Sequence, residues 1–335
     1  MIGRHLPALA LAVLAACAGP RPGEAPRQHV LRDARSKMGA PFEIQLVATD
    51  EAAGRAAIDA AYDEIDRVEA LISEWRESSE ISEVNRRAGE APVGVGPDLL
   101  AVLERSIWTS EVTEGAFDVT FAACGRAWSI RERRVATEAE ISACLPHIGF
   151  RRIELDARRS TVFLPDPAMR IGVAGIGQGY GVDRAVEVLE ARGFDSWVVD
   201  GAGDVRLSGT NVDRPWSVGI AHPRRRGELF AVVRPGRGAI VTSGDYERYF
   251  ERDGVVYHHI LDPATGRPAR RSIAVTVIAP NATDADALST GLFVLGPERG
   301  IEVAEALPGV EALIFGPDLE VRRTSGFPET LPPAP

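Results

Sequence analysis

The stretch AIVTSGDYERYFERDGVVYHHILDPATGRPARRSIAVTVIAPNATDADALSTGLFVL, residues 239–295, carries most of the information about the fold. Apolar, mostly β-branched runs at 239–242, 255–260 and 274–278 predict strands, because turn-forming Gly, Asp and Pro residues separate them. Residues 284–295 follow with helical character. Strands that succeed one another through turns and pack beside helices indicate the α+β class.

The rest of the chain continues this mixture of helices and strands. Apolar residues recur at helical spacing where helices are expected and alternate where strands are expected. Beyond the stretch above, the predicted elements are strands at 42–47, 196–199 and 216–220, a hairpin over 153–164, and helices at 52–75, 98–113 and 179–192.

The amino terminus indicates export. A short basic start precedes an apolar run, Leu6 to Ala16, which is too short to span about 30 Å of hydrocarbon. The run closes on Leu-Ala-Ala and Cys17, which resembles the lipobox of bacterial lipoproteins, so we expect Cys17 to be acylated. An ordinary cleaved signal that carries a cysteine is the alternative. We therefore expect a lipid-anchored protein of the bacterial cell envelope, facing the periplasm from the outer or inner membrane.

Composition divides the chain into four parts. Residues 1–16 form the predicted signal peptide, and the Pro- and Gly-rich residues that follow predict a flexible tether over 17–34. One folded domain is expected over 35–325, and residues 326–335 form a Pro-rich tail. No membrane-spanning segment is predicted in the rest of the chain.

The charge balance restricts the partners. The formal net charge is −10, from 48 acidic and 38 basic residues, so we expect no nucleic-acid partner. An anionic nucleotide would also be repelled unless a cation and helix amino termini supply local positive potential. Besides Cys17 the chain has Cys124 and Cys144, which could pair in an oxidising compartment or remain two buried thiols.

Asp286 and Thr290 lie four residues apart on a predicted helix. Their oxygens would lie on one face about one turn apart, a spacing that suits two ligands of one hard cation. A capping box with Thr283 as the N-cap residue and Asp286 reaching back to it fits the same letters. The spacing alone does not decide between the two.

A glycine-rich turn precedes the helix predicted at 179–192. Its glycines fall at 175, 177, 179 and 181, so the G-x-G-x-x-G pattern of dinucleotide-binding folds is not met. Such a turn offers backbone N–H groups to an anion and lets carbonyls approach a ligand or ion. Close packing of the helix on the sheet is the alternative.

His258 and His259 end a predicted strand, so they should point to opposite faces. No third His or Cys stands at ligand spacing, which argues against zinc. His259 is the best candidate for a general base, although a histidine on a strand is more often structural. Trp75 could stack on a flat ring and Asp118 could accept ring N–H groups, with core packing and a turn cap as the alternatives.

Five segments in one order carry a resemblance to a known family. They are Gly-Ala-Phe-Asp-Val-Thr (115–120), Gly-Gln-Gly-Tyr-Gly-Val-Asp-Arg-Ala (177–185), Thr-Ser-Gly-Asp-Tyr-Glu-Arg-Tyr (242–249), His-Ile-Leu-Asp-Pro-Ala-Thr-Gly (259–266) and Ala-Asp-Ala-Leu-Ser-Thr (285–290). Together they are similar to the FAD:protein FMN transferases of the ApbE type, from about Lys37 to Gly300. That family has an α+β fold and is exported and often lipid-anchored.

The resemblance implies a set of site residues. Mg²⁺ would be held by Asp286, Thr290 and the backbone carbonyl of Gly175, and His259 would be the base. The pyrophosphate of FAD would lie near the 175–179 turn. The residues expected to contact FAD are Met38, Trp75, Ala116, Phe117, Asp118, Gly172, Gln178 and, through its backbone, Leu261.

The implied reaction joins FMN to another protein. A threonine hydroxyl of an acceptor redox protein carrying Asp-Gly-x-Ser/Thr-Gly-Ala-Thr would attack the FMN-side phosphorus of FAD and expel AMP. No such motif occurs in this chain, so the acceptor would be a separate protein. A lipid-anchored FAD-binding protein without turnover and a periplasmic FAD pyrophosphatase are the alternatives.

Two positions depart from the family pattern. Gly172 stands where the family commonly has Asp, and Gln178 stands where it commonly has Lys or Glu. The first change removes an expected contact to the flavin or adenosine end of FAD. The second change cannot supply charge to a phosphate, so weaker FAD affinity or a different nucleotide is expected.

Overall fold

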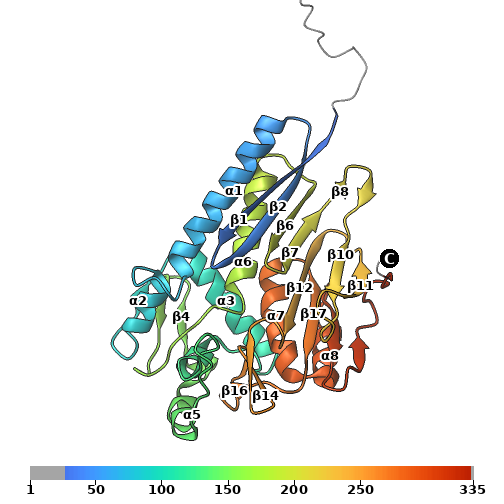
Figure 1. Cartoon of the computed structure of the whole chain (residues 1–335). Helices are drawn as coiled ribbons and strands as arrows, with labels where there is room; N and C mark the ends of the chain where they lie inside the picture. Colours follow the sequence, from blue (N-terminus) through green and yellow to red (C-terminus); the bar gives the residue numbers. More distant parts are fainter. Residues whose placement is uncertain (1–26, 333–335) are drawn as a thin grey trace, which may run out of the picture.

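The computed structural model describes residues 27–332, built around an eight-stranded sheet (Figure 1). The strand order is β1-β2-β6-β7-β12-β17-β18-β19, and every neighbouring pair is antiparallel. The strands are β1 (His29–Lys37), β2 (Ala40–Ala48), β6 (Trp197–Gly201), β7 (Asp204–Ser208), β12 (Gly238–Gly244), β17 (Ala274–Ala279), β18 (Glu311–Phe315) and β19 (Val321–Arg323). The predicted α+β class is confirmed.

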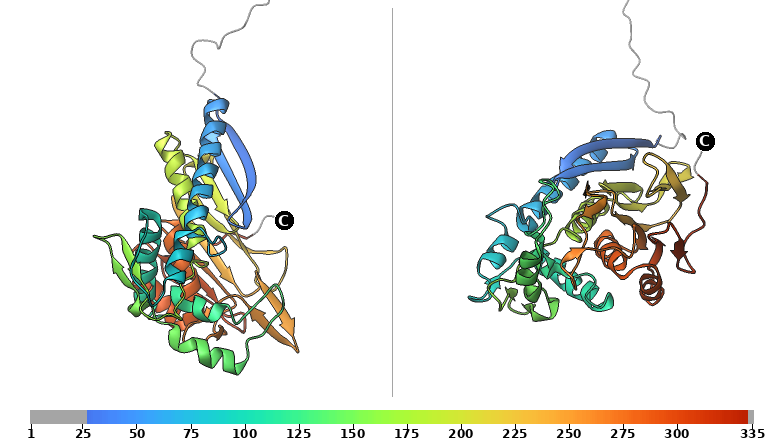
Figure 2. Two further views of the ribbon diagram at one scale, coloured as in Figure 1. Left: turned by 90° about the vertical axis from the view of Figure 1, so that its left-hand side faces the viewer. Right: turned by 60° about the horizontal axis from the view of Figure 1, so that its bottom comes forward.

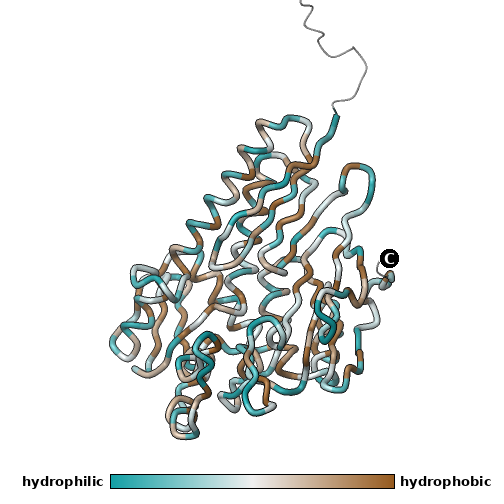
Figure 3. Tube along the Cα trace, viewed as in Figure 1, coloured by the Kyte–Doolittle hydropathy of each residue, from teal (hydrophilic) through white to brown (hydrophobic). Residues whose placement is uncertain are grey.

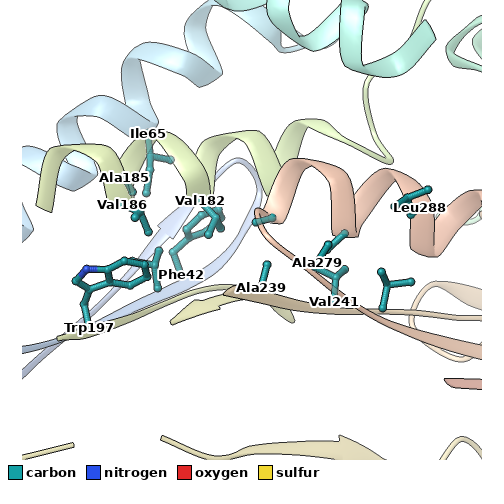
Figure 4. Packing of buried hydrophobic residues seen from close by; sticks show 14 of the residues in the cluster. Phe42, Ile65, Val182, Ala185, Val186, Trp197, Ala239, Val241, Ala279 and Leu288 are labelled. Carbon is teal, nitrogen blue, oxygen red and sulfur yellow. The ribbon is translucent and has the colours of Figure 1, made fainter. Parts of the chain in front are cut away.

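Four helices cover one face of this sheet. They are α1 (Glu51–Ile72), α6 (Gly177–Ala191), α7 (Ala282–Leu295) and α8 (Pro297–Glu305). Figure 4 shows Val182 of α6 and Leu288 of α7 above Phe42, Trp197 and Val241 of the strands, all buried in one hydrophobic cluster. Figure 3 shows apolar residues gathered along the inner strands. Burying this face is the main source of stability, since each large apolar side chain contributes about 1.5–3 kcal/mol.

A second hydrophobic cluster lies at the carboxyl end of α1, and Figure 2 shows the elements around it from two further sides. They are α2 (Glu80–Arg86), α3 (Pro97–Val112), α4 (Ala122–Gly125), α5 (Glu138–Cys144), the 3₁₀ helices η1 (Val119–Phe121), η2 (Leu145–His147) and η3 (Phe150–Arg152), and the sheet of β3 (Val93–Gly94), β5 (Thr161–Phe163) and β4 (Glu154–Asp156). The predicted hairpin over 153–164 is confirmed as β4 and β5.

Short hairpins complete the fold. The other face of the large sheet carries a third hydrophobic cluster, to which β10 and β11 contribute. The pairs are β8 (Thr210–Asn211) with β9 (Arg214–Pro215), β10 (Val218–Ala221) with β11 (Leu229–Val233), β13 (Tyr249–Arg252) with β14 (Val255–His258), and β15 (Leu261–Asp262) with β16 (Arg267–Pro268).

Two predicted boundaries were wrong. Residues 29–34, assigned to the tether, belong to β1, which pairs with β2 over nine residues. The signal was weak because β1 is an edge strand in which only Leu31 is fully buried. The Pro-rich tail is not frayed throughout, since Phe327 is buried and Leu331 exchanges backbone hydrogen bonds with Val232.

The element predictions are otherwise displaced by a few residues. The helix predicted at 52–75 ends at Ile72, and the strand predicted at 255–260 ends at His258. Within residues 27–332, no helix combines the length and apolarity needed to cross a membrane. The predicted signal peptide and Cys17 lie outside the described residues.

Candidate active site

A pocket of about 500 Å³ opens where the start of α6, the middle of α7 and the hairpins around residues 244–263 meet. It brings together most of the predicted site residues from distant parts of the sequence. Those that line it are Ala116, Phe117, Asp118, Gly175, Gln178, His259, Leu261, Asp286 and Thr290. Met38, Trp75 and Gly172 are outside the lining.

One side of the pocket, which we call the anchor wall, consists of Gly175, Asp204, Asp286 and Thr290. A side chain at position 175 would place its Cβ 3.1 Å from Thr290 Oγ1, so the glycine turn and α7 are in contact here. The N–H of Gly179 donates to Asp286 Oδ2 at 3.1 Å. The three predicted metal ligands therefore lie side by side, as helical spacing and the turn suggested.

The start of α7 is fixed by two side chains. Asn281 is the N-cap residue, and its Oδ1 accepts from the N–H of Asp284 at 2.8 Å. Asp183 of α6 accepts from the N–H groups of Ala282 and Thr283 at 2.9 and 2.8 Å. The capping-box alternative for Thr283 is therefore wrong, which leaves the Asp286 carboxylate free to face the pocket.

Asp204 was missed by sequence reasoning. It begins β7, lines the pocket and is only 8% exposed. Burial raises the pKa of Asp286, and burial together with the negative charge of Asp286 raises the pKa of Asp204. The one signal in the sequence was the run Asp200 to Asp204, two acids around glycines at a strand end.

These residues fit a hard divalent cation. Two buried carboxyl groups face one pocket, and within residues 27–332 neither forms an ion pair with a basic side chain. No cluster of three or more His, Cys, Asp or Glu exists in the described part of the chain, so a cation here would also need hydroxyl and carbonyl oxygens. Thr290 and Gly175 supply those, and an all-oxygen set suits Mg²⁺.

A second part of the lining, which we call the mouth wall, carries His259 and Leu261 from the hairpins. His259 Nδ1 lies 3.3 Å from the carbonyl oxygen of Arg248, and because a carbonyl only accepts, Nδ1 carries the proton. Nε2 is then free to accept one. Desolvation by the packed pocket wall lowers the pKa of His259, although the ring still reaches solvent, so the imidazole is neutral at pH 7.

His258 points the other way, as strand geometry predicts. It is 2% exposed, its Nε2 donates to the carbonyl of Ala269 at 2.8 Å, and its ring packs edge-on against Phe293. Burial lowers its pKa as well. Only His259 of the pair lines the pocket.

The mouth wall is held from outside by the segment around α4 and α5. Trp128 Nε1 donates to the carbonyl of Gly266 at 2.9 Å, and Cys124 and Cys144 form a disulfide. A Cβ at Gly266 would lie 3.2 Å from Cys124 Sγ, so the disulfide packs directly under the turn that follows Leu261. The paired alternative for the two cysteines is the one the structure contains.

Asp118 and Phe117 have the structural roles that were the alternatives at the level of sequence, and both line the pocket. Asp118 Oδ1 accepts from the N–H and the hydroxyl of Thr120 at 2.8 and 2.6 Å, and Oδ2 accepts from the N–H of Phe150 at 2.9 Å. Phe117 is 4% exposed within the second hydrophobic cluster. Both residues are structural and also line the pocket, so their predicted contacts to FAD stay predictions.

The remaining predicted residues lie around the rim. Met38 occupies the β1–β2 turn next to two lining residues, and its N–H donates to Glu69 Oε2 at 2.8 Å. Trp75 is 95% exposed just beyond α1. Gln178 lines the pocket, but its amide N–H donates to the carbonyl of Gly201. Gly172 packs against Glu74 instead of opening onto the pocket.

Arg248 was also missed. It lines the pocket beside His259 and brings a positive charge to a site that must otherwise repel an anion. Its signal was present, because the segment 242–249 was part of the resemblance, but no role was assigned to any residue within it.

The chain is similar to known proteins along most of its length. The profile of the ApbE family matches residues 38–314. The chain belongs to the ApbE family. Among curated relatives, the FAD:protein FMN transferase of Treponema pallidum is 37% identical over 290 residues, covering 81% of this chain and 80% of the relative. That of Vibrio cholerae is 34% identical over 277 residues, covering 80% and 82%.

Solved ApbE structures share the fold. The ApbE protein of Thermotoga maritima superimposes with a TM-score of 0.81 at 31% identity, covering 90% of this chain and 98% of that one. The flavin transferase ApbE of Vibrio cholerae gives a TM-score of 0.79 at 30% identity, covering 90% and 99%. The predicted family and its α+β fold are confirmed.

Proposed function

We propose that this chain is an FAD:protein FMN transferase, which moves FMN from FAD to a threonine hydroxyl of an acceptor protein and releases AMP. One observation carries the proposal. The pocket joins a wall of buried hard oxygen donors to a neutral histidine with a free ring nitrogen. The names of the relatives indicate the substrate, and the oxygen donors and the histidine are the groups that such a transfer would need.

The anchor wall would hold the phosphate end of FAD. Asp286, Thr290 and the Gly175 carbonyl would bind Mg²⁺, with Asp204 as a further carboxylate beside it. Mg²⁺ bound there would neutralise charge that develops on the phosphoryl oxygens. Arg248 would add positive charge from beside His259.

The mouth wall would handle the acceptor. His259 Nε2 would take the proton of the threonine hydroxyl as its oxygen bonds to the FMN-side phosphorus. The bond from that phosphorus to the bridging oxygen breaks, and AMP leaves with the bridging oxygen. Positioning of the reacting groups would contribute most to the rate, because phosphoryl transfer requires little covalent chemistry from the protein.

A second activity, hydrolysis of FAD to FMN and AMP, follows from one observation. His259 is solvent-exposed, so water can reach the position that the acceptor hydroxyl would take. The pocket would then act as a pyrophosphatase when no acceptor is present.

We further propose that the protein works outside the cytoplasm, tethered through acylated Cys17. The disulfide between Cys124 and Cys144 supports this, since disulfides persist in oxidising compartments. The acceptor would be an exported redox protein that carries Asp-Gly-x-Ser/Thr-Gly-Ala-Thr.

The test is incubation with FAD, Mg²⁺ and a protein bearing that motif, followed by intact mass and assay of AMP. Transfer adds one FMN phosphodiester to the acceptor for each AMP released. AMP without modified acceptor would assign hydrolysis instead, and bound FAD with neither product would leave a binding protein.

A further inference from the structure

The carboxylate of Glu74 lies against the glycine-rich turn at residues 172–175, although Glu74 belongs to a distant part of the sequence. It follows the end of α1 at Ile72 and is partly buried. Its Oε1 accepts from the N–H of Val173 at 2.8 Å. One peptide group of the turn is thus tied to this side chain.

Gly172 makes room for this carboxylate. A Cβ at position 172 would lie 2.8 and 2.9 Å from the two carboxylate oxygens of Glu74 and 3.0 Å from Ala122 Cβ. No side chain at 172 is compatible with Glu74 in its present position. The carboxylate therefore stands where a side chain at position 172 would begin.

We propose that Glu74, just beyond the end of α1, is the positioning residue of the 172–175 turn and supplies the carboxylate that holds it. The inference rests on the proposed function, because this turn presents the Gly175 carbonyl to the cation. The Val173 carbonyl accepts from the N–H of Ile176 at 3.1 Å, and that N–H shares one rigid peptide plane with the Gly175 carbonyl, so holding Val173 also restrains the direction of the Gly175 carbonyl. Hydrogen bonds to a charged acceptor are about twice as strong as neutral ones, which favours a carboxylate here.

Glu74 also links the 172–175 turn to an exposed aromatic residue, Trp75. Trp75 is 95% exposed and follows Glu74 directly in the chain. Holding Glu74 against Val173 therefore also sets where the backbone of Trp75 starts relative to the pocket. Loss of Glu74 should loosen both the turn and this tryptophan.

The first test is a double-mutant cycle on equilibrium FAD binding, measured by flavin fluorescence without acceptor. Glu74→Ala should weaken FAD binding about tenfold, since it removes a charge-assisted hydrogen bond. Gly172→Asp should weaken it at least as much, because the new Cβ overlaps the carboxylate. The double variant should return to within about threefold of the wild type, since an acid is restored without the overlap.

Glu80→Ala is the matched control. Glu80 Oε2 accepts from the N–H of Gly96 at 2.9 Å, and a Cβ at Gly96 would lie 2.9 Å from Glu80 Oε1. The contact is of the same kind, but neither residue lines the pocket. Glu80→Ala should lower the melting temperature about as much as Glu74→Ala and leave FAD binding unchanged.

Two further readouts separate positioning from stability. Amide hydrogen exchange at Val173 should become faster in Glu74→Ala, and the Mg²⁺ concentration for half-maximal FAD binding should rise. Glu74→Gln keeps an acceptor oxygen at the same place and should stay within about threefold of the wild type in FAD binding.

The proposal is overturned if Glu74→Ala behaves like Glu80→Ala, with lower stability but unchanged FAD affinity and unchanged exchange at Val173. A double variant that is weaker than either single one would also overturn it. If the wild type binds FAD but transfers no FMN, the proposed function fails, while the cycle and the exchange data still decide the role of Glu74.

Discussion

The two walls of the pocket are held in place by different means. Asp286 on the anchor wall belongs to a helix whose residues are almost all buried and whose first turn is capped by Asn281 and Asp183. His259 on the mouth wall belongs to short hairpins at the surface, held by a disulfide and a tryptophan hydrogen bond. The anchor wall is thus fixed from within the core, which suits the proposed cation site, and the mouth wall is fixed at the surface, which suits entry of the proposed acceptor protein.

The largest effect is expected on the anchor wall. Asp286→Ala should lower kcat more than about a hundredfold, because several kcal/mol of charge stabilisation depend on the cation it holds. Asp284→Ala, two residues earlier, removes the ion pair with Arg105 instead and should leave kcat unchanged. Intact-mass assays of both variants make the comparison. Equal activity of the two would remove Asp286 from the site.

On the mouth wall, His259→Ala should lower kcat about a hundredfold without changing the melting temperature, because a general base typically contributes a factor of this order. Its neighbour gives the control. His258→Gln keeps a donor for the Ala269 carbonyl in the core, so it should cost stability and leave kcat near the wild type. The reverse pattern would exchange the roles of the two histidines.

The pH profile sharpens the assignment of His259. Because desolvation lowers its pKa below the ordinary 6.5, the neutral, proton-accepting form persists as the pH falls from 8 to 6.5. No loss of kcat/KM from His259 is therefore expected in that range. An acid limb with a midpoint above 6.5 that disappears in His259→Ala would contradict the lowered pKa.

How much of this contrast the sequence could predict depends on how local each feature is. The spacing of Asp286 and Thr290 lies within one helix, so both were found. Asp204 reaches the same wall only because β7 pairs with β6 and β12, and that pairing is not written in any short segment. The contact of Glu74 with Val173, 99 positions away, was beyond reach for the same reason.

The edges of the fold were predicted least well. The periodicity of α1 and α7 depends on broad buried faces, which a single sequence displays clearly. Strand β1 exposes charged residues along most of its length, so its first residues were assigned to the tether. Its partner β2 was found because its apolar residues alternate.

Packing between α6 and α7 offers a stability test of the anchor wall. A Cβ at Gly179 would lie 2.3 Å from the Ala282 carbonyl oxygen and 2.8 Å from Asp286 Cβ. Gly179→Ala should therefore destabilise the protein by about 1–3 kcal/mol and disturb Asp286. Gly94→Ala meets no atom within 4 Å and is the matched control in thermal unfolding. Equal melting temperatures would mean that the two helices separate easily.

The smallest effect on chemistry is expected from the disulfide. Cys124→Ser with Cys144→Ser should lower the free energy of unfolding by about 3 kcal/mol, the value typical of a loop of this size. Because the disulfide supports the turn after Leu261, the KM for FAD should rise a few fold while the Mg²⁺ dependence stays the same. A changed Mg²⁺ dependence would show that the two walls are not independent.

The most direct test of the account is the position of a bound cation. In crystals of the protein grown with Mn²⁺ and FAD, we expect an anomalous scattering peak within ligand distance of Asp286, Thr290 and the Gly175 carbonyl, on the anchor wall. A peak elsewhere in the pocket, or none when FAD is bound, would contradict the account.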